Sequence, residues 1–288
     1  MDNTQQLFII GNPRSGTSLL RIMMNSHSSM VMPPECGFIQ WWFKKYGNWS
    51  SKSNLSGFIS DLQTSKKIET WQLDFDALYF FLEQCVSKSY EELMFNVVAF
   101  YGFSKQQKMN PAVLGDKNNY YIEHLELLIR IAPKSKFLII LRDPRDVYCS
   151  YKGIQELNSK STYAPILSQD LQSFTRDWYY NQSEILKFLS KLDKKQFKVI
   201  NYEDLVLKSK TVLVSVCDFL KVSFEEKMLH YYKTNDEPIA LLEWKKKTLQ
   251  PLDPNSIGRY RKLLSPTEVM KIEEDTFGIY RQLKQVII

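Results

Sequence analysis

Residues 7 to 18, LFIIGNPRSGTS, combine a short apolar run, a turn bounded by two glycines and the start of a helical pattern. Gly11 and Gly16 stand five positions apart. Glycine readily adopts positive φ, and it lets backbone N–H groups approach a bound anion. A helix that starts after such a turn directs its positive end at the same point. The segment therefore predicts a strand, a phosphate-binding turn and a helix.

The turn matches the P-loop pattern GxxxxGK[ST] except at one position. Where ATP-dependent enzymes have a lysine, this chain has Thr17, and the nearest fixed cation is Arg14 inside the loop. The usual lysine reaches the β and γ phosphates of ATP. Its absence indicates a nucleotide other than ATP, or transfer of a group other than phosphoryl.

A second informative segment is KFLIILRDPRDVYCSY, residues 136 to 151. The apolar run 137–141 is typical of a strand buried on both faces of a parallel sheet. Asp143 followed by Pro144 predicts a helix start, so Arg142 lies at the end of the strand. Ser150 follows eight residues later, two turns along the helix. Ligands bind at the carboxyl ends of strands in open α/β sheets.

Together these segments resemble the sulfotransferases that use 3′-phosphoadenosine 5′-phosphosulfate (PAPS), in particular their bacterial and tyrosylprotein branch. In that family a PxSGT loop holds the 5′-phosphosulfate, and an arginine with a serine eight residues later holds the 3′-phosphate. The positions that match are Pro13, Arg14, Ser15, Gly16, Thr17 and Ser18 in the loop, and Arg142 with Ser150 in the second element.

The resemblance extends over nearly the whole chain, through 115–146, VINYEDLV at 199–206 and SIGRYRKLLSPTE at 256–268. It implies an α/β fold with a central parallel sheet flanked by helices, similar to P-loop NTPases, with a helical cap inserted. We expect one domain over 1–288, with residues 38–110 as the cap and acceptor region. Further helices are predicted at 17–26, 73–85, 90–103, 120–131, 170–189 and 208–220, strands near 30–32 and at 197–201, and a polar loop near the acceptor at 153–169.

The resemblance also implies catalytic residues. Arg14 would face the 5′-phosphate and the bridging oxygen, and Lys117 the transferring sulfuryl group. An acceptor hydroxyl needs a base, and Glu35 in MVMPPECGF is similar to the PPE glutamate of several branches. Burial by neighbouring aromatic residues would raise the pKa of Glu35. The alternatives are that Glu35 caps a helix, and that His124 is the base, as the histidine near the lysine is in cytosolic sulfotransferases.

Donor contacts are expected from the later segments. Trp178 and Tyr202 are candidates for packing against adenine, although Trp178 fits core packing equally well. The C-terminal loop resembles the family segment that closes over the 3′-phosphate, and its residues Ser256, Gly258, Arg259 and Arg261 are expected to bind the donor. The sequence leaves open which of the two arginines points inward. Lys245 to Lys247 are interpreted as a solvated surface, with a lid over the donor as the alternative.

Composition sets broader limits. A net charge of +6, from 38 Lys and Arg against 32 Asp and Glu, suits an anionic donor, and no basic run is long enough to indicate nucleic acid. The four cysteines form no CxxC pair, so they are interpreted as free thiols, with no metal site. We find no apolar stretch of membrane-spanning length and no room for a signal peptide, and expect a cytoplasmic protein. The oligomeric state is left open.

The predicted function is transfer of the sulfuryl group of PAPS to a hydroxyl or nitrogen of a small-molecule acceptor, natural products included. The nucleotide product would be 3′-phosphoadenosine 5′-phosphate (PAP), and no metal would be required. Two alternatives stay open: a P-loop kinase acting on a small molecule, and a catalytically inactive relative that binds a partner. The sequence does not identify the acceptor.

Overall fold

The computed structural model describes residues 4–287, and its centre is a five-stranded parallel sheet with strand order β2-β3-β1-β4-β5. The strands are β1 (Gln5–Ile10), β2 (Met30–Val31), β3 (Val113–Lys117), β4 (Lys136–Leu141) and β5 (Phe197–Asn201). All four strand pairs are parallel. The predicted α/β fold with a central parallel sheet is confirmed.

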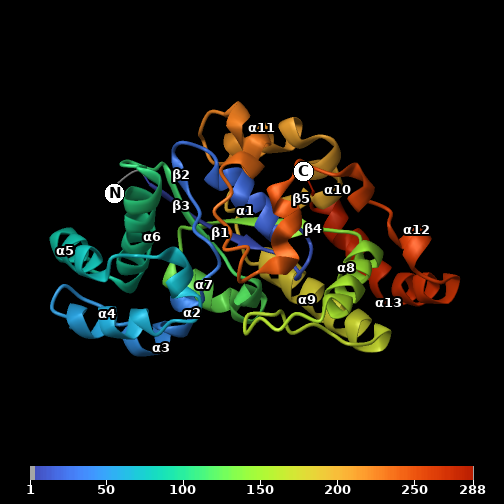
Figure 1. The fold of residues 1–288 in the computed structure, drawn as a ribbon, viewed down its shortest axis with the longest axis horizontal. Helices are drawn as coiled ribbons and strands as arrows, with labels where there is room; N and C mark the ends of the chain where they lie inside the picture. The colour runs from blue at the N-terminus through green and yellow to red at the C-terminus, as the bar shows by residue number, and fades with distance from the viewer. Residues whose placement is uncertain (1–3, 288) are drawn as a thin grey trace.

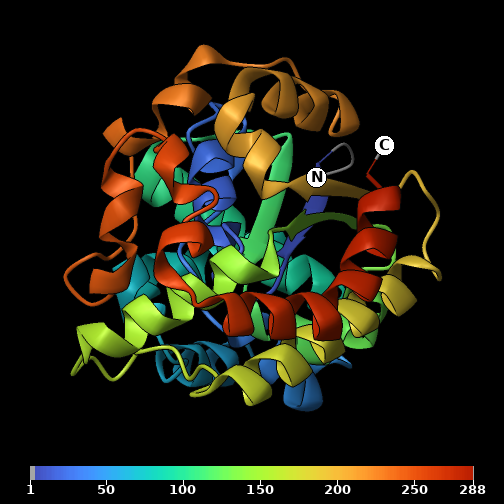
Figure 2. The same ribbon diagram turned by 90° about the vertical axis from the view of Figure 1, so that its right-hand side faces the viewer.

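Helices cover both faces of this sheet (Figure 1). Alternate residues of β1 point to opposite faces: Leu7 and Ile9 join one buried cluster, and Phe8 and Ile10 join the other. The first cluster lies under α1 (Thr17–Asn25), α10 (Tyr202–Leu207) and α11 (Ser209–Phe219). The second lies against α6 (Tyr90–Gln106), α7 (Leu125–Ile131), α8 (Pro144–Leu157), α9 (Leu171–Leu189) and α13 (Pro266–Gln285). Figure 2 shows α13 running along the outside of the helices on this side.

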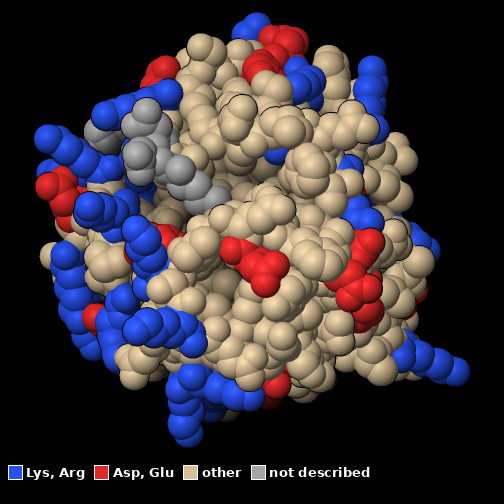
Figure 3. Space-filling model, turned by 90° about the vertical axis from the view of Figure 1, so that its left-hand side faces the viewer, with Lys and Arg blue, Asp and Glu red and all other residues tan. Residues whose placement is uncertain are grey.

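The chain between β2 and β3 forms a helical layer at one end of the sheet (Figure 1). It contains α2 (Phe38–Trp41), α3 (Phe43–Tyr46), α4 (Leu55–Gln63), the 3-10 helix η1 (Ile68–Trp71), α5 (Phe75–Cys85) and α6. The two helices predicted within it are confirmed. The outer face on this side has lysine and arginine side chains along its edge and mainly uncharged side chains at its middle (Figure 3).

Two predicted element boundaries are wrong. The helix predicted at 120–131 is two helices, a 3-10 helix η2 (Asn119–His124) and α7, because His124 has φ −132° and ψ 23° between them. The loop predicted to begin at Gly153 begins at Asn158, since α8 continues to Leu157 and ends on Asn158 in a left-handed conformation with φ 44°. Ile154 packs against the core and explains the extra helical turn.

The C-terminal part contains four short helices before α13. They are the 3-10 helices η3 (Glu226–Lys233), η4 (Glu243–Leu249) and η5 (Pro254–Ser256), and α12 (Tyr260–Leu263). η3 packs against α1 and α11, and α12 packs against α8. Among the residues described, no helix has both the length and the apolar character needed to cross a bilayer.

Candidate active site

A cavity of about 1090 Å³ lies where the strands end. Each strand is followed, shortly after its carboxyl end, by a residue that lines the wall of the cavity. This is the expected place for a ligand site in an open α/β sheet. These residues are Pro13 after β1, Glu35 after β2, Asn118 after β3, Arg142 after β4 and Tyr202 after β5. The rest of the wall comes mainly from 149–168 and 243–259.

The turn between β1 and α1 has the predicted shape. Gly16 has φ 99°, and a Cβ atom built there would lie 2.5 Å from Cδ2 of Tyr202, so this position requires glycine. Arg14 also has a positive φ, 71°, which is uncommon for a residue with a side chain. The turn residues Pro13, Arg14, Gly16, Thr17 and Ser18 line the cavity, whereas Ser15 is buried and its N–H donates to the carbonyl of Asn12 at 3.0 Å.

Arg142 and Ser150 both contact the phosphate-binding turn. Nη1 of Arg142 donates to the carbonyl of Arg14 at 3.0 Å, and Nε of Arg14 donates to Oγ of Ser150 at 3.0 Å. Both Arg142 and Ser150 line the cavity. The structure thus brings together the predicted turn and the arginine and serine eight residues apart.

The two arginines lie together without acidic partners. Within residues 4–287, neither guanidinium has a carboxylate within 4.0 Å, and the buried Nε of Arg142 has no hydrogen-bond partner. Burial, and then the positive charge of Arg142, lower the pKa of Arg14 to about 10. Arg142 is buried and Arg14 is half-buried. Two such cations side by side are unfavourable unless an anion neutralises them. This end of the cavity is therefore suited to bind an anion.

Tyr202, the first residue of α10 directly after β5, contacts both Arg142 and the C-terminal loop. The guanidinium of Arg142 lies 4.1 Å from the centre of the Tyr202 ring, and the hydroxyl of Tyr202 donates to Oγ of Ser256 at 3.1 Å. Nη2 of Arg142 also donates to the carbonyl of Ser256 at 2.9 Å. The predicted C-terminal loop therefore closes against the strand end that carries Arg142.

The geometry of that loop distinguishes its two arginines. Arg259 lines the cavity, whereas Arg261 lies outside the lining and packs near the ring of Tyr260, 5.0 Å from its centre. Gly258 has φ +72°, and its N–H donates to Oδ2 of Asp146 on α8 at 2.6 Å. This bond turns the chain so that Arg259 faces the cavity.

At the other end of the cavity, Glu35 lies between two lysines. Its Oε2 accepts from Nζ of Lys117 at 2.5 Å, and its Oε1 accepts from Nζ of Lys67 at 3.1 Å. Glu35 is 6% exposed and Lys117 1%. Glu35 lines the cavity, while Lys117, at the end of β3, lies directly behind it. The structure thus brings the predicted base and the predicted catalytic lysine together.

The predicted raised pKa of Glu35 is wrong. Burial alone would raise this pKa, but the charges of Lys117, Lys67 and Lys245 hold it well below its usual range. The lysines outweigh burial because three positive charges act on one carboxylate. Burial in turn lowers the pKa of Lys117 to about 8, although Glu35 opposes that shift.

Besides Arg261, two predicted site residues lie away from the cavity. His124, the alternative base, ends η2 half-buried and is not part of the cavity wall. Trp178, a candidate adenine contact, is 1% exposed and packs in the core with its ring 6.2 Å from that of Tyr280. Trp178 is therefore a core residue, because the period of α9 directs it at α13 and away from the strand ends.

Comparisons with known proteins identify the family. Residues 6–226 match the Sulfotransferase family. The chain belongs to the sulfotransferase family. A Caenorhabditis briggsae protein, provisionally named a protein-tyrosine sulfotransferase, is 25% identical over 243 residues, 81% of this chain and 71% of that protein. The chain spans 32–71% of the length of the curated relatives it matches.

Solved structures share its fold. The sulfotransferase domain from the curacin biosynthetic pathway has 24% identity and a TM-score of 0.62, covering 94% of this chain and 96% of that domain. The mouse sulfotransferase SULT7A1 complexed with PAP has 12% identity and a TM-score of 0.51, covering 98% of this chain and 88% of that one. The chain therefore has the fold that the resemblance implied.

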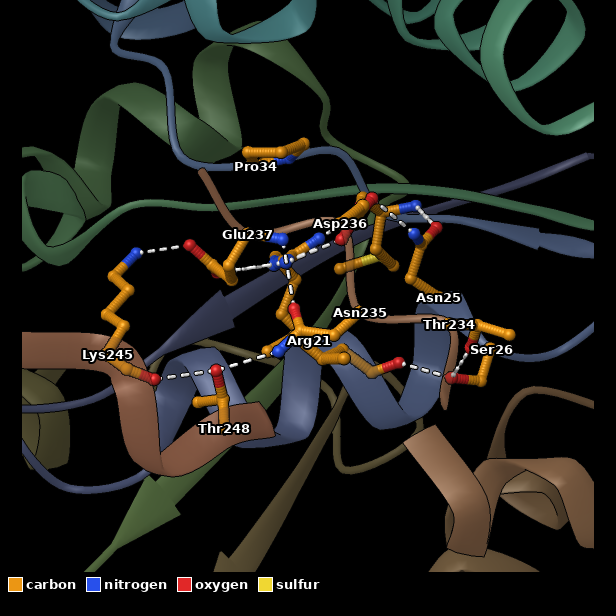
Figure 4. Close-up of polar contacts among 12 residues, drawn as sticks. Arg21, Asn25, Ser26, Pro34, Thr234, Asn235, Asp236, Glu237, Lys245 and Thr248 are labelled. Atoms are coloured by element: carbon orange, nitrogen blue, oxygen red, sulfur yellow. Dashed lines mark hydrogen bonds and ion pairs between the residues drawn. The ribbon is translucent and has the colours of Figure 1, made fainter. Parts of the chain in front are cut away.

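The sequence did not identify three charged residues, Lys245, Glu237 and Arg21, as part of the site. Lys245 was interpreted as solvated surface, but it is 7% exposed, lines the cavity and pairs with Glu237 at 2.8 Å. Glu237 in turn pairs with Arg21 on α1 at 2.9 Å (Figure 4). One signal in the sequence was available: Arg21 interrupts the apolar run LLRIMM in a helix that is buried on most sides. A cation at such a position requires a partner.

The insertion between β2 and β3 contributes less to the cavity than predicted. From residues 38–110, only Trp41, Lys66 and Lys67 line it. Most aromatic side chains of the insertion pack into or against the core instead. The wall away from the phosphate-binding turn comes mainly from α8 and the loop up to Ser168. That loop was predicted to lie near the acceptor.

Among residues 4–287, no group of three or more His, Cys, Asp and Glu side chains is placed to hold a metal ion.

Proposed function

We propose that this protein transfers the sulfuryl group of PAPS to a hydroxyl or nitrogen of a small-molecule acceptor, with PAP as the second product. The observation that carries the proposal is the pair of guanidiniums at the phosphate-binding turn, Arg142 buried and Arg14 half-buried, which have no carboxylate partner within residues 4–287. Two arginines without acidic partners suit a ligand with more than one phosphate-like group. The bound PAP of the mouse relative supports the same donor.

In this proposal, different groups of residues bind different parts of the donor. The turn 13–18 and the N-terminus of α1 would hold the 5′-phosphosulfate, since backbone N–H groups and the helix dipole favour an anion there. Arg142 and Ser150 would hold the 3′-phosphate, supported by Arg259 from the C-terminal loop. Tyr202 remains the candidate for contact with the adenosine, because it lines the cavity beside Arg142.

In the proposed reaction the acceptor oxygen or nitrogen forms a bond to sulfur while the bond from sulfur to the bridging oxygen breaks. The electron pair of that bond stays on the 5′-phosphate of PAP, and Glu35 takes the proton of the acceptor. Arg14 and Lys117 would stabilise the charge that grows on the bridging oxygen and around sulfur. Glu35 is the candidate for this role because it lines the cavity and is ionised, although its lowered pKa makes it a weak base.

The acceptor would occupy the half of the cavity beyond Glu35. Its wall is largely apolar, with Trp41, Ile122, Ile154, Leu157 and Tyr163. A cavity of about 1090 Å³ is large for a single small ligand, and it has room for a nucleotide together with a small acceptor. These features support an apolar or aromatic alcohol or amine.

A second candidate acceptor is a tyrosine in a protein. The names of curated relatives, among them the Caenorhabditis briggsae protein, favour it. A phenol side chain would enter the same apolar half of the cavity, with its oxygen at Glu35.

Two measurements test the proposal. Calorimetry without magnesium should show binding of PAP at least tenfold tighter than binding of AMP, which lacks the 3′-phosphate. Incubation with [³⁵S]PAPS and a panel of aromatic alcohols, amines and tyrosine peptides should then label an acceptor. Magnesium-dependent ATP binding without PAP binding would favour the kinase alternative. PAP binding without label on any acceptor, and without release of sulfate, would favour the inactive relative.

A further inference from the structure

A chain of buried ion pairs connects the cavity to the helix of the phosphate-binding turn (Figure 4). Nζ of Lys245 lies 2.8 Å from Oε2 of Glu237. The other oxygen of Glu237 accepts from Nε and Nη2 of Arg21, at 3.1 and 2.9 Å. Arg21 is fully buried, and Glu237 and Lys245 are each 7% exposed. Each carboxylate oxygen of Glu237 thus has a cationic partner, and the position of Lys245 is fixed from α1.

Arg21 also ties this chain to the loop that carries Glu35. Its Nη1 donates to the carbonyl of Met32 at 2.7 Å, three residues before Glu35, and its Nη2 pairs with Asp236 at 2.8 Å. One side chain therefore sets α1, the loop after β2 and the segment before η4 relative to one another. Figure 4 shows Arg21 at the centre of these contacts. The contacts of this guanidinium thus fix the turn helix and the Glu35 loop, which line the cavity, relative to the segment that binds Lys245.

The lysines of η4 serve different ends of the cavity. The charge of Lys245 acts on Glu35 and Lys117, since it lowers the pKa of both. Burial lowers the pKa of Lys247, followed by the charge of Arg259 and, more weakly, those of Arg142 and Arg14. Lys245 therefore faces the Glu35 end, where the acceptor and the reacting group would meet. Lys247 belongs to the arginine end.

The charges around Glu35 do not balance without a ligand. Four cations, Arg21, Lys67, Lys117 and Lys245, are paired with three carboxylates, Glu35, Asp236 and Glu237. Over these ion pairs one positive charge is left over. The buried Asp116 beside Lys117 offsets it only in part at neutral pH, because burial raises the pKa of Asp116 to about 7. A buried excess charge is costly unless an anion neutralises it. A sulfuryl group brings one negative charge to this end of the cavity.

From these contacts we infer that Lys245 is a further catalytic residue, which contacts the sulfuryl group of the bound donor, and that Glu237 is its positioning residue, anchored by Arg21. The inference rests on the proposed function. Lys245 stands at the cavity surface, whereas Lys117 lies behind Glu35. Lys245 therefore reaches the transferring group directly, and it stabilises the negative charge spread over the sulfuryl oxygens and the bridging oxygen as the sulfur–oxygen bond breaks.

The test compares two nucleotides that differ only in the sulfuryl group. Calorimetry should show that Lys245→Met weakens PAPS binding at least tenfold and changes PAP binding by less than threefold, because only PAPS carries the contacted group. Lys245→Arg should recover most of the PAPS affinity. The control is Lys233→Met, which removes an exposed lysine of η3 outside the cavity wall and should change neither affinity. Equal effects on PAPS and PAP, or no effect on either, would overturn the inference.

The positioning role of Glu237 has its own readout. Glu237→Gln should weaken PAPS binding several-fold and PAP binding much less. In a Lys245→Met background the same change should cause no further loss of PAPS affinity, since the lysine that it positions is gone. This double variant also removes both charges of the pair, and so remains informative if Lys245→Met alone does not fold. Equal PAPS losses from Glu237→Gln in both backgrounds would show a structural role only. Failure of the wild-type protein to bind PAP would instead overturn the proposed function.

Discussion

The two ends of the cavity hold their cations in different ways. At the arginine end, Arg14 and Arg142 have no carboxylate partner among the described residues. At the Glu35 end, Lys67, Lys117 and Lys245 are each paired with a buried carboxylate. Cations without partners favour a bound anion, whereas paired cations hold a carboxylate ionised and in place. This difference is consistent with the proposal that one end binds the donor and the other performs the chemistry.

The most direct way to break this comparison is to neutralise Glu35. Glu35→Gln keeps the shape but cannot take a proton, so turnover should fall about 10³-fold while PAP binding stays within threefold. The measurement is kcat with the acceptor found by labelling, alongside calorimetry with PAP. Glu83→Gln, on α5 and outside the cavity wall, is the matched control and should leave kcat unchanged. Near-normal turnover of Glu35→Gln together with loss of activity in His124→Ala would assign the base to η2.

A substitution at the arginine end should instead weaken donor binding. Arg142→Ala removes the guanidinium that bonds to the turn and to Ser256, and the affinity for PAP should fall roughly 10²-fold. The affinity for AMP should change less than threefold, because AMP lacks the 3′-phosphate that Arg142 would contact. Equal losses for both nucleotides in calorimetry would show that Arg142 supports the fold of the turn rather than the 3′-phosphate.

The pH dependence of the reaction tests the role of Lys117 at the Glu35 end. The folded pKa of Lys117 is lowered to about 8, so its charge is complete below that pH and is lost above it. The value of kcat/KM should therefore fall about tenfold per pH unit above pH 8. In Lys117→Arg the basic limb should move beyond the measurable range, since arginine stays charged. A basic limb that is unchanged in this variant would exclude Lys117 as its origin.

The acidic side should show little change from Glu35. The pKa of Glu35 is held below its ordinary value of 4.5, and Glu35 therefore keeps its negative charge as the pH falls to that value. The value of kcat/KM should therefore show no limb from Glu35 between pH 7 and about pH 5. The buried Asp116 beside Lys117 is a separate group that titrates in this range, because burial raises its pKa to about 7. An acidic limb near pH 6 that disappears in Glu35→Gln would show that the lysines act on Glu35 less strongly than their distances imply.

Sequence reasoning located the parts of the site that depend on local patterns. The turn at 11–16, Arg142 at a strand end and Asp143 as a helix cap follow from short motifs with a physical cause, and the structure has them as predicted. The parallel sheet as a whole was implied by the family resemblance, and the apolar run 137–141 predicted one of its strands. These features could be predicted because neighbouring residues along the chain determine them.

The relations that the sequence did not provide are those between distant segments. Lys245 and Glu35 are separated by more than two hundred positions, and nothing near Lys245 in the sequence distinguishes it from Lys246, which is exposed. The low pKa of Glu35 likewise depends on lysines from η4, β3 and the residues before η1. Charge pairing across a cavity leaves no periodic pattern, so the run of three lysines resembled a solvated surface.

The smallest expected effects concern the insertion between β2 and β3, where the acceptor specificity was predicted to lie. Trp41 lines the cavity, and its ring is 6.2 Å from that of Tyr120, which lines it too. Trp41→Ala should raise the KM of an aromatic acceptor about fivefold, the usual effect of losing one aromatic contact, with the affinity for PAP unchanged. Tyr79→Ala, on α5 and outside the wall, should change this KM less than twofold. Steady-state kinetics at saturating donor compares the two variants. If Tyr79→Ala had the larger effect, the acceptor would extend over the insertion, as expected for a large acceptor such as a protein, and the small-molecule acceptor proposed here would be wrong.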